Sequence, residues 1–394
     1  MTYQKATILI SIPCFAVVAF SFIPLIFPAL LIENTVLLQV RDVNYFEIGA
    51  WTIPLLLTNL IFFSLYFANK AKKLPSIINK ITTYLTKNDI SSKTAFLVLI
   101  ILLTFYIIFS IDEFNHEEFE LGDYAGVKKS VEELEFSNTL ITHHLRYGLL
   151  YVSLLLFDNI RILPFFASIG LLLITYLLTL ELTKKRLSGI VAFVTLLQSN
   201  MFLLFDTTAT YENFWTLFYF LSLYLILKNS FPSSISYFCS ILSKALTITY
   251  FPINLFAIFR TKQFSLKLLI GYGILVVILI FALFSNNFVH QEKINFDLTK
   301  IIVGFVSFSN FIRFDSLILL ITIPTITILA TKKWMNYKNI ELVLFGIFFL
   351  FISNPITYGV IDMTSMPYRI VPLLVMISIS FGMLFSNPKI LGQK

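Results

Sequence analysis

Long apolar runs alternate with short polar segments along nearly the whole chain. Runs of this kind are typical of membrane-spanning helices, which need about 20 apolar residues each. We therefore expect an all-α, polytopic integral membrane protein with about 12 transmembrane helices. The candidate spans are residues 7–32, 49–69, 94–111, 160–181, 187–205, 212–228, 233–246, 247–259, 265–286, 314–331, 339–353 and 366–386.

Several segments fit a position at the membrane surface better than a span. The apolar run 145–157 is brief, and the pair 233–246 and 247–259 is short enough for either two spans or a re-entrant hairpin. In residues 70–93, lysines are interleaved with leucines and isoleucines. This pattern favours a basic amphipathic helix on the inner leaflet over a solvated connector.

Composition excludes the soluble classes. Of the 394 residues, 57% are hydrophobic and only 13% are charged, and the mean hydropathy is +0.85. Because soluble domains carry about 25% charged residues, a soluble enzyme and a disordered chain are both excluded. The first apolar run is too long for the core of a signal peptide, so we expect it to be a retained span.

The charges divide unevenly between the two sides that these spans define. With a cytoplasmic N-terminus, 19 of the 29 basic residues fall on the cytoplasmic side, whereas 19 of the 22 acidic residues fall outside. The basic bias satisfies the positive-inside rule and places both termini in the cytoplasm. The net charge of +7 then reflects basic loops, and we expect the bilayer as a partner and no nucleic acid.

The first large external loop, residues 112–144, contains most of the candidate catalytic acids. Asp112 and Glu113 follow a span, and Asp123 precedes a predicted surface helix over 124–136 with Val127, Val131 and Leu134 inward. A carboxylate at that point is also a common helix cap. The loop ends with two histidines, His143 and His144.

Further polar residues lie on the same predicted external face. Arg161, Glu212, Tyr368 and Arg369 lie at span ends, and Lys244 lies between two short apolar runs. Carboxylates and cations that gather at one interface suggest a site for a lipid-linked anion, where the cations bind phosphate and a carboxylate removes a proton from a hydroxyl. A transporter with an external gate would satisfy the same composition.

The order of these features resembles the GT-C membrane glycosyltransferases, and specifically the branch with protein O-mannosyltransferases and the aminoarabinose lipid A transferase. The resemblance covers roughly residues 94–386. Residues 1–93 would then be a two-span extension with a basic amphipathic cytoplasmic segment, and 387–394 a cytoplasmic tail. The motifs that carry the likeness are residues 122–125 (Gly-Asp-Tyr-Ala), 143–148, Arg161, 183–186, 211–215, 243–245 (Ser-Lys-Ala) and 368–372.

This resemblance implies inverting transfer of a sugar from a polyprenyl-phosphate-linked donor to an acceptor hydroxyl of a glycan, lipid or protein, at the external face of the cell membrane. Asp123 would be the general base, with Asp112 and Glu113 as the other candidates, and Glu212 would orient a cation or a sugar hydroxyl. The substrate-binding residues would be His143, His144, Arg161, Lys244, Arg369 and Tyr368. No cofactor is demanded, although a divalent cation near the acids would be compatible with the residues.

Two other functions fit the sequence. A polymerase or ligase of lipid-linked glycans would use a diphosphate donor and would also have acidic and arginine-rich external loops. A lipid or solute transporter would show internal repeats and charged residues at span centres. The chain has no clear repeat, and its charges lie at span ends, with Lys244 the exception. A structural membrane subunit would leave the acidic external loop without a role.

Overall fold

The computed structural model describes most of the chain, and all of its regular structure is helical. The described residues are 3–29, 44, 46–71, 73, 75–116, 118, 121–133, 144–260, 266–284, 297–331, 337–361 and 367–386, and no β-strand occurs within them. The predicted all-α class is therefore confirmed.

Six helical segments in these ranges are long and apolar enough to cross a membrane. They lie in α1 (Tyr3–Ile26), α2 (Thr52–Lys70), α4 (Ser92–Ser110) with η2 (Ile111–Asn115), α7 (Ile162–Thr183), α16 (Tyr337–Ile361), and η6 (Pro367–Ile370) with α17 (Val371–Leu384). These helices support a membrane-embedded protein, since a bilayer core about 30 Å thick requires helices of this length.

In other helices the apolar stretch is only 10–17 residues long. They include α6 (His144–Phe157), α8 (Arg186–Leu197), α10 (Phe214–Leu227), η5 (Ala245–Tyr250) with α12 (Phe251–Arg260), α13 (Leu266–Phe284) and α15 (Ser316–Thr331). The predicted number of 12 spans is therefore not confirmed. The helix α14 (Leu298–Ile312) lies in a region where we predicted no span.

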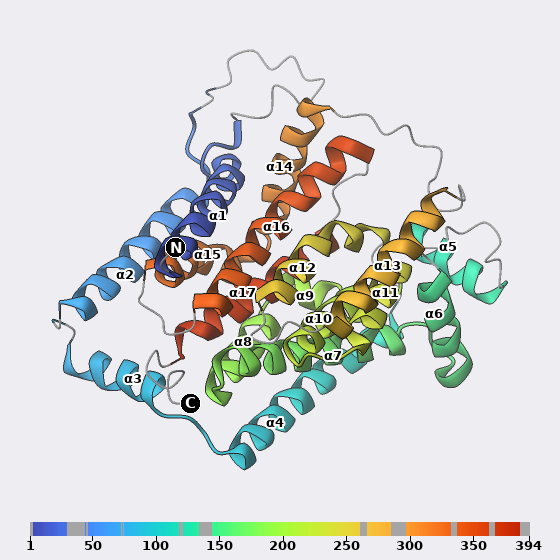
Figure 1. Cartoon of the computed structure of the whole chain (residues 1–394), viewed down its shortest axis with the longest axis horizontal. Coiled ribbons are helices and arrows are strands. Elements are labelled where there is room, and N and C mark those ends of the chain that lie inside the picture. Colours follow the sequence, from blue (N-terminus) through green and yellow to red (C-terminus); the bar gives the residue numbers. More distant parts are fainter. Residues whose placement is uncertain are drawn as a thin grey trace. The chain divides into compact units, whose positions relative to one another are not determined.

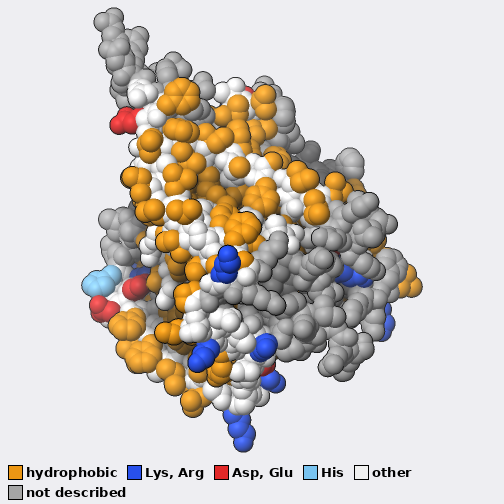
Figure 2. Space-filling model, turned by 90° about the vertical axis from the view of Figure 1, so that its left-hand side faces the viewer, with side chains coloured by type: hydrophobic (Ala, Val, Ile, Leu, Met, Phe, Trp, Pro, Cys, Tyr) orange, Lys and Arg blue, Asp and Glu red, His pale blue; other side chains and the backbone are white. Residues whose placement is uncertain are grey.

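Two of the long helices are apolar yet largely exposed. Only 11% of the apolar window of α2 and 22% of that of α4 is buried, and large side chains such as Leu60 and Phe109 face outward. Figure 2 shows hydrophobic side chains over a wide area of one face. Because soluble proteins rarely expose apolar patches of this extent, these faces are suited to contact with lipid.

The chain divides into two compact units, each built from segments distant in sequence. Unit 1 comprises residues Met1–Ile90, Leu182–Met201 and Lys293–Lys394, and unit 2 comprises Ser91–Glu181 and Phe202–Glu292. The helix α3 (Ser76–Lys87) belongs to unit 1, and α5 (Leu121–Glu132) and α11 (Pro232–Ser243) belong to unit 2 (Figure 1). The domain limits expected from the resemblance stay a prediction.

Unit 1 is held together by apolar helix packing. Its main contacts join α1 with α16, α14 with α16, and α8 with α17. Small residues allow close approach, as at Gly346 of α16, where an added Cβ would lie 2.5 Å from the terminal methyl of Met376. Leu344, Phe351 and Leu374 are fully buried in this core.

Unit 2 is organised around the hairpin of α10 and α11. Asn229 makes the turn with φ of 55°, a left-handed conformation that asparagine tolerates. Two serines of α11 then bind carbonyls of α10, Ser236 at Phe218 and Ser240 at Trp215, both at 2.7 Å. These bonds satisfy the hydroxyls in the interface and align the ends of the two helices.

The acidic loop of unit 2 forms a helix that starts earlier than we predicted. The helix α5 begins at Leu121, so Asp123 lies in its first turn and not at its N-cap. Val127 and Val131 are buried, as expected, against a cluster that includes Leu150 of α6 and Ile160. Leu134 lies outside the described residues. This packing positions the acidic segment against α6.

Candidate functional site

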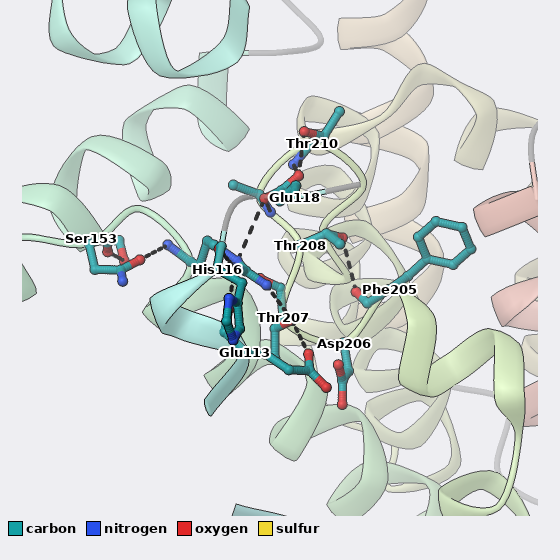
Figure 3. A network of polar contacts seen from close by, with 12 residues as sticks. Glu113, His116, Glu118, Ser153, Phe205, Asp206, Thr207, Thr208 and Thr210 are labelled. Atoms are coloured by element: carbon teal, nitrogen blue, oxygen red, sulfur yellow. Dashed lines mark hydrogen bonds and ion pairs between the residues drawn. The ribbon is translucent and has the colours of Figure 1, made fainter. Parts of the chain in front are cut away.

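Two polar segments meet at one end of unit 2. One is η2 with the residues up to 118, which follow α4, and the other is the loop 205–213, which joins α9 (Asn200–Leu204) to α10. We call their contacts the polar network, which consists of Tyr106, Glu113, His116, Glu118, Arg146, Arg161 and residues 206–212. All of these residues belong to unit 2. Figure 3 shows the part of the network around Glu113, Glu118 and Thr207.

Arg161 lies at the centre of the polar network. It precedes α7, its side chain is buried, and Nε and Nη2 donate to the carbonyl and hydroxyl of Thr207 at 2.9 and 2.8 Å. Nη1 donates to the carbonyls of Glu113 and His116 at 2.5 and 2.6 Å. Because all three guanidinium nitrogens bind protein acceptors, Arg161 joins the two polar segments.

Glu118 compensates the charge of Arg161 and fixes the other side of the loop. Its carboxylate is 3.8 Å from Arg161 Nε. It accepts the backbone N–H groups of Ala209 and Thr210 at 2.5 and 3.2 Å, and the Thr210 hydroxyl at 2.6 Å. These donors and the nearby cation satisfy the buried carboxylate and fix the loop against it.

A second buried ion pair follows the loop. Arg146 Nε of α6 lies 2.8 Å from a carboxylate oxygen of Glu212, and Nη2 donates to the carbonyls of Ala209 and Thr210. Burial raises the pKa of Glu212, whereas the charges of Arg146 and Lys244 lower it. Glu212 is 3% exposed, so its charge depends on these two cations.

Lys244 lies where two short helical segments meet. It has an extended backbone between α11 and η5, and its side chain is partly exposed. The ammonium group lies over the Trp215 ring, 5.8 Å from its centroid. This cation therefore lies near the start of α10, on a partly accessible part of unit 2, and its charge acts on Glu212.

Asp206 is a buried acid next to the first segment. Its Oδ2 accepts the O–H of Tyr106 at 2.6 Å, and the neighbouring Thr207 hydroxyl donates to Glu113 at 2.6 Å. Burial raises the pKa of Asp206 to about 8, the Tyr106 bond opposes this shift, and the charge of Glu113 adds to it. Asp206 is therefore largely protonated at neutral pH.

The three candidate bases differ in their environment. Asp123 is exposed, and its carboxylate accepts the O–H of Tyr211 at 2.8 Å. Asp112 is also exposed and pairs with His116 at 3.7 Å within the same turn. Glu113 binds Thr207, as described above. Of these, Asp123 combines exposure with a contact to the residue that precedes Glu212.

The structure brings together Asp123, Glu113, Arg161, Glu212 and Lys244 in unit 2. Asp112 adjoins Glu113 and also belongs to unit 2. His143 lies outside the described residues, and His144 begins α6 with its side chain outside the described part. Tyr368 and Arg369 belong to unit 1, where both are buried and the guanidinium lies 5.9 Å from the Tyr368 ring centroid.

Sequence reasoning did not select several members of the polar network. These are Tyr106, Glu118, Asp206, Thr207 and Thr210. Glu118 is one of many acids in its loop, and nothing in the local sequence distinguishes it from the others. Asp206 had a usable signal, because it is an isolated acid directly after an apolar run.

Comparison with known proteins and the arrangement of possible metal ligands complete the description of the site. No family model, no curated protein and no solved structure matches the chain. Within the described ranges, no group of three His, Cys, Asp or Glu side chains is arranged to hold a metal ion.

Proposed function

We propose that the chain is an inverting membrane glycosyltransferase of the GT-C type that uses a polyprenyl-phosphate sugar donor. The observation that carries the proposal is the polar network, which places acids and cations from four distant segments at one end of a unit built from apolar helices. Such a site gives a charged headgroup polar ligands while a long apolar tail stays in lipid.

In the proposed reaction, Asp123 is the general base. Its carboxylate takes the proton of the acceptor hydroxyl, the hydroxyl oxygen bonds to the anomeric carbon, and the bond from that carbon to the phosphate oxygen breaks. The phosphate keeps the bonding electrons and leaves as a polyprenyl monophosphate. General base catalysis of this kind contributes typically 10² to 10⁴-fold.

Lys244 is the cation that we assign to the leaving phosphate. It is partly exposed and belongs to the same end of unit 2 as Glu212. Arg161 receives a positioning role, because its nitrogens already bind Thr207, Glu113 and His116. Arg369, which belongs to unit 1, stays a predicted substrate-binding residue. Burial of the polyprenyl tail would supply much of the affinity, at about 0.8 kcal/mol per methylene.

The test uses the full chain in lipid nanodiscs with a radiolabelled polyprenyl-monophosphate sugar and, separately, a polyprenyl-diphosphate glycan. We expect transfer from the monophosphate donor and a loss of about 10² to 10⁴-fold in Asp123→Asn. Glu132→Gln, an exposed acid on the same helix, is the matched control and should retain activity.

Three outcomes would change the assignment. Normal activity in Asp123→Asn with a loss in Asp112→Asn would transfer the role of base to Asp112. Turnover of the diphosphate donor alone would favour a glycan polymerase or ligase. Parent activity in Asp123→Asn, Asp112→Asn and Lys244→Met, all normally folded, would refute the site.

A further inference from the structure

The helix α3 has an exposed face on which apolar side chains are bordered by lysines. Ile77, Ile81 and Tyr84 are 71, 53 and 63% exposed. With 3.6 residues per turn these three side chains fall on one stripe of the helix. Lys80 and Lys87, both exposed, follow one border of this stripe. The surface therefore combines a narrow apolar strip with a row of cations.

The other apolar residues of α3 fix its orientation in unit 1. Ile78 and Leu85 are partly buried. The Lys185 ammonium group donates to the carbonyls of Leu85 and of Phe385, the residue that follows α17. After α3, Asp89 accepts the backbone N–H of Leu187 at 3.1 Å and pairs with Arg186. With one apolar edge held, the stripe of Ile77, Ile81 and Tyr84 stays directed outward.

The chain connection places this stripe close to a membrane surface. The candidate span in α2 ends at Asn69, and α3 begins at Ser76. The six residues between them extend to at most about 22 Å. The helix α3 therefore begins near the bilayer surface at which α2 emerges, if α2 spans the membrane.

The charge of residues 70–88 indicates which kind of surface the stripe of α3 binds. From residue 70 to residue 88 the chain has five lysines and no acidic residue. Lysines beside an apolar strip attract anionic headgroups, and tyrosine is enriched at the membrane interface. We propose that the stripe of α3 binds the headgroup region of an anionic phospholipid surface, with Ile77, Ile81 and Tyr84 inserted and Lys80 and Lys87 on phosphates. This proposal does not depend on the proposed function.

The test measures the depth of single nitroxide labels on the full chain. In a background with Cys14 and Cys239 replaced by alanine, one label is attached at Ile77→Cys on the stripe and another at Asn79→Cys on the opposite, exposed face. Accessibility to oxygen reports lipid, and accessibility to a neutral nickel chelate reports water. Nanodiscs of phosphatidylcholine are compared with nanodiscs that also contain phosphatidylglycerol.

We expect the label at position 77 to favour oxygen in the anionic nanodiscs and the label at position 79 to favour the nickel chelate. The pair Lys80→Glu and Lys87→Glu should remove the preference at position 77. The pair Lys128→Glu and Lys129→Glu, two exposed lysines of unit 2, should not.

Other results overturn the proposal. Equal access of the nickel chelate to both labels would place the stripe in water. Protection of position 77 from both reagents would mean that protein, such as a second copy, covers the stripe. An oxygen preference that is identical with and without phosphatidylglycerol would exclude anionic lipid as the partner.

Discussion

Helical hydroxyls such as those of Ser21 and Thr357 in unit 1 bind locally, whereas the buried charged residues of the polar network in unit 2 bind across long sequence distances. Ser21 and Thr357 donate to carbonyls four positions earlier in their own helices. Arg161 binds carbonyls 45 and 48 positions away, and Glu118 binds Thr210, 92 positions away. A local bond forms wherever the helix forms, but a distant one requires a single arrangement of the loops. The buried charges of the polar network therefore specify the tertiary structure of unit 2, whereas a local hydroxyl bond specifies little beyond the helix that contains it.

The strongest test of this contrast is Arg161→Met. It removes the donors to Thr207, Glu113 and His116 and leaves Glu118 buried without its cation, so we expect a loss of about 3–5 kcal/mol of stability. Thermal unfolding in detergent measures it. The control is Arg186→Met in unit 1, whose pair with Asp89 is partly exposed and should contribute at most about 1 kcal/mol. Equal losses of stability in Arg161→Met and Arg186→Met would show that the buried network stabilises the fold no more than the partly exposed pair does.

The next effect is on the pH dependence of stability. Because folding raises the pKa of Asp206 to about 8, the folded state holds a proton that the unfolded state releases above about pH 4. This contribution is fully present below pH ~4 and is lost as the pH rises toward ~8, by up to about 1.4 kcal/mol per pH unit. Asp206→Asn should flatten the profile between pH ~5 and ~8. Parallel profiles for parent and variant would contradict the protonated state.

Packing in unit 1 should respond less strongly. Gly346→Leu adds a side chain against Met376, and overpacking of this kind costs about 1–3 kcal/mol. Gly273 of α13, which has no heavy atom within 4 Å of its added Cβ, provides the control as Gly273→Leu. Denaturation of the two variants should show a clear loss for Gly346 alone. If Gly346→Leu is as stable as the parent, the contact between α16 and α17 accommodates the added side chain at little cost in stability.

The smallest effect should come from an ion pair of unit 2 that lies outside the polar network. Lys228 and Glu181 are 2.5 Å apart, but the lysine side chain is 45% exposed. Lys228→Met should therefore change the stability by less than about 1 kcal/mol. A loss comparable with that of Arg161→Met would mean that membership of unit 2, and not burial, determines the effect.

The sequence predicted helices better than it predicted their contacts. Apolar runs identify α2, α7 and α10, because the need to satisfy backbone groups in lipid leaves the helix as the solution. The start of α5 was placed too late, since a polar surface segment has several acids that suit an N-cap. The helix α14 was not predicted as a span, although most of its residues are apolar.

The candidate site was predictable only in part. Glu212 was selected as an acid at the start of an apolar run and Lys244 as a cation between two apolar runs, and the structure places both in unit 2. The partners of Arg161 could not be predicted, because carbonyls of residues 113, 116 and 207 accept its bonds. Every residue has a backbone carbonyl, so the residue types do not indicate which carbonyls accept these bonds. Only the fold shows it.

Tyr211 and Glu212 are consecutive, yet they bind different helices. The tyrosine reaches Asp123 of α5, and the glutamate reaches Arg146 of α6. The backbone of these two residues therefore links α5 with α6. In the proposed reaction, a donor headgroup that draws Glu212 away from Arg146 would also pull Tyr211 off the Asp123 carboxylate. Binding of the donor would then free the Asp123 carboxylate from the Tyr211 hydroxyl, so that donor binding and activation of the base would occur together.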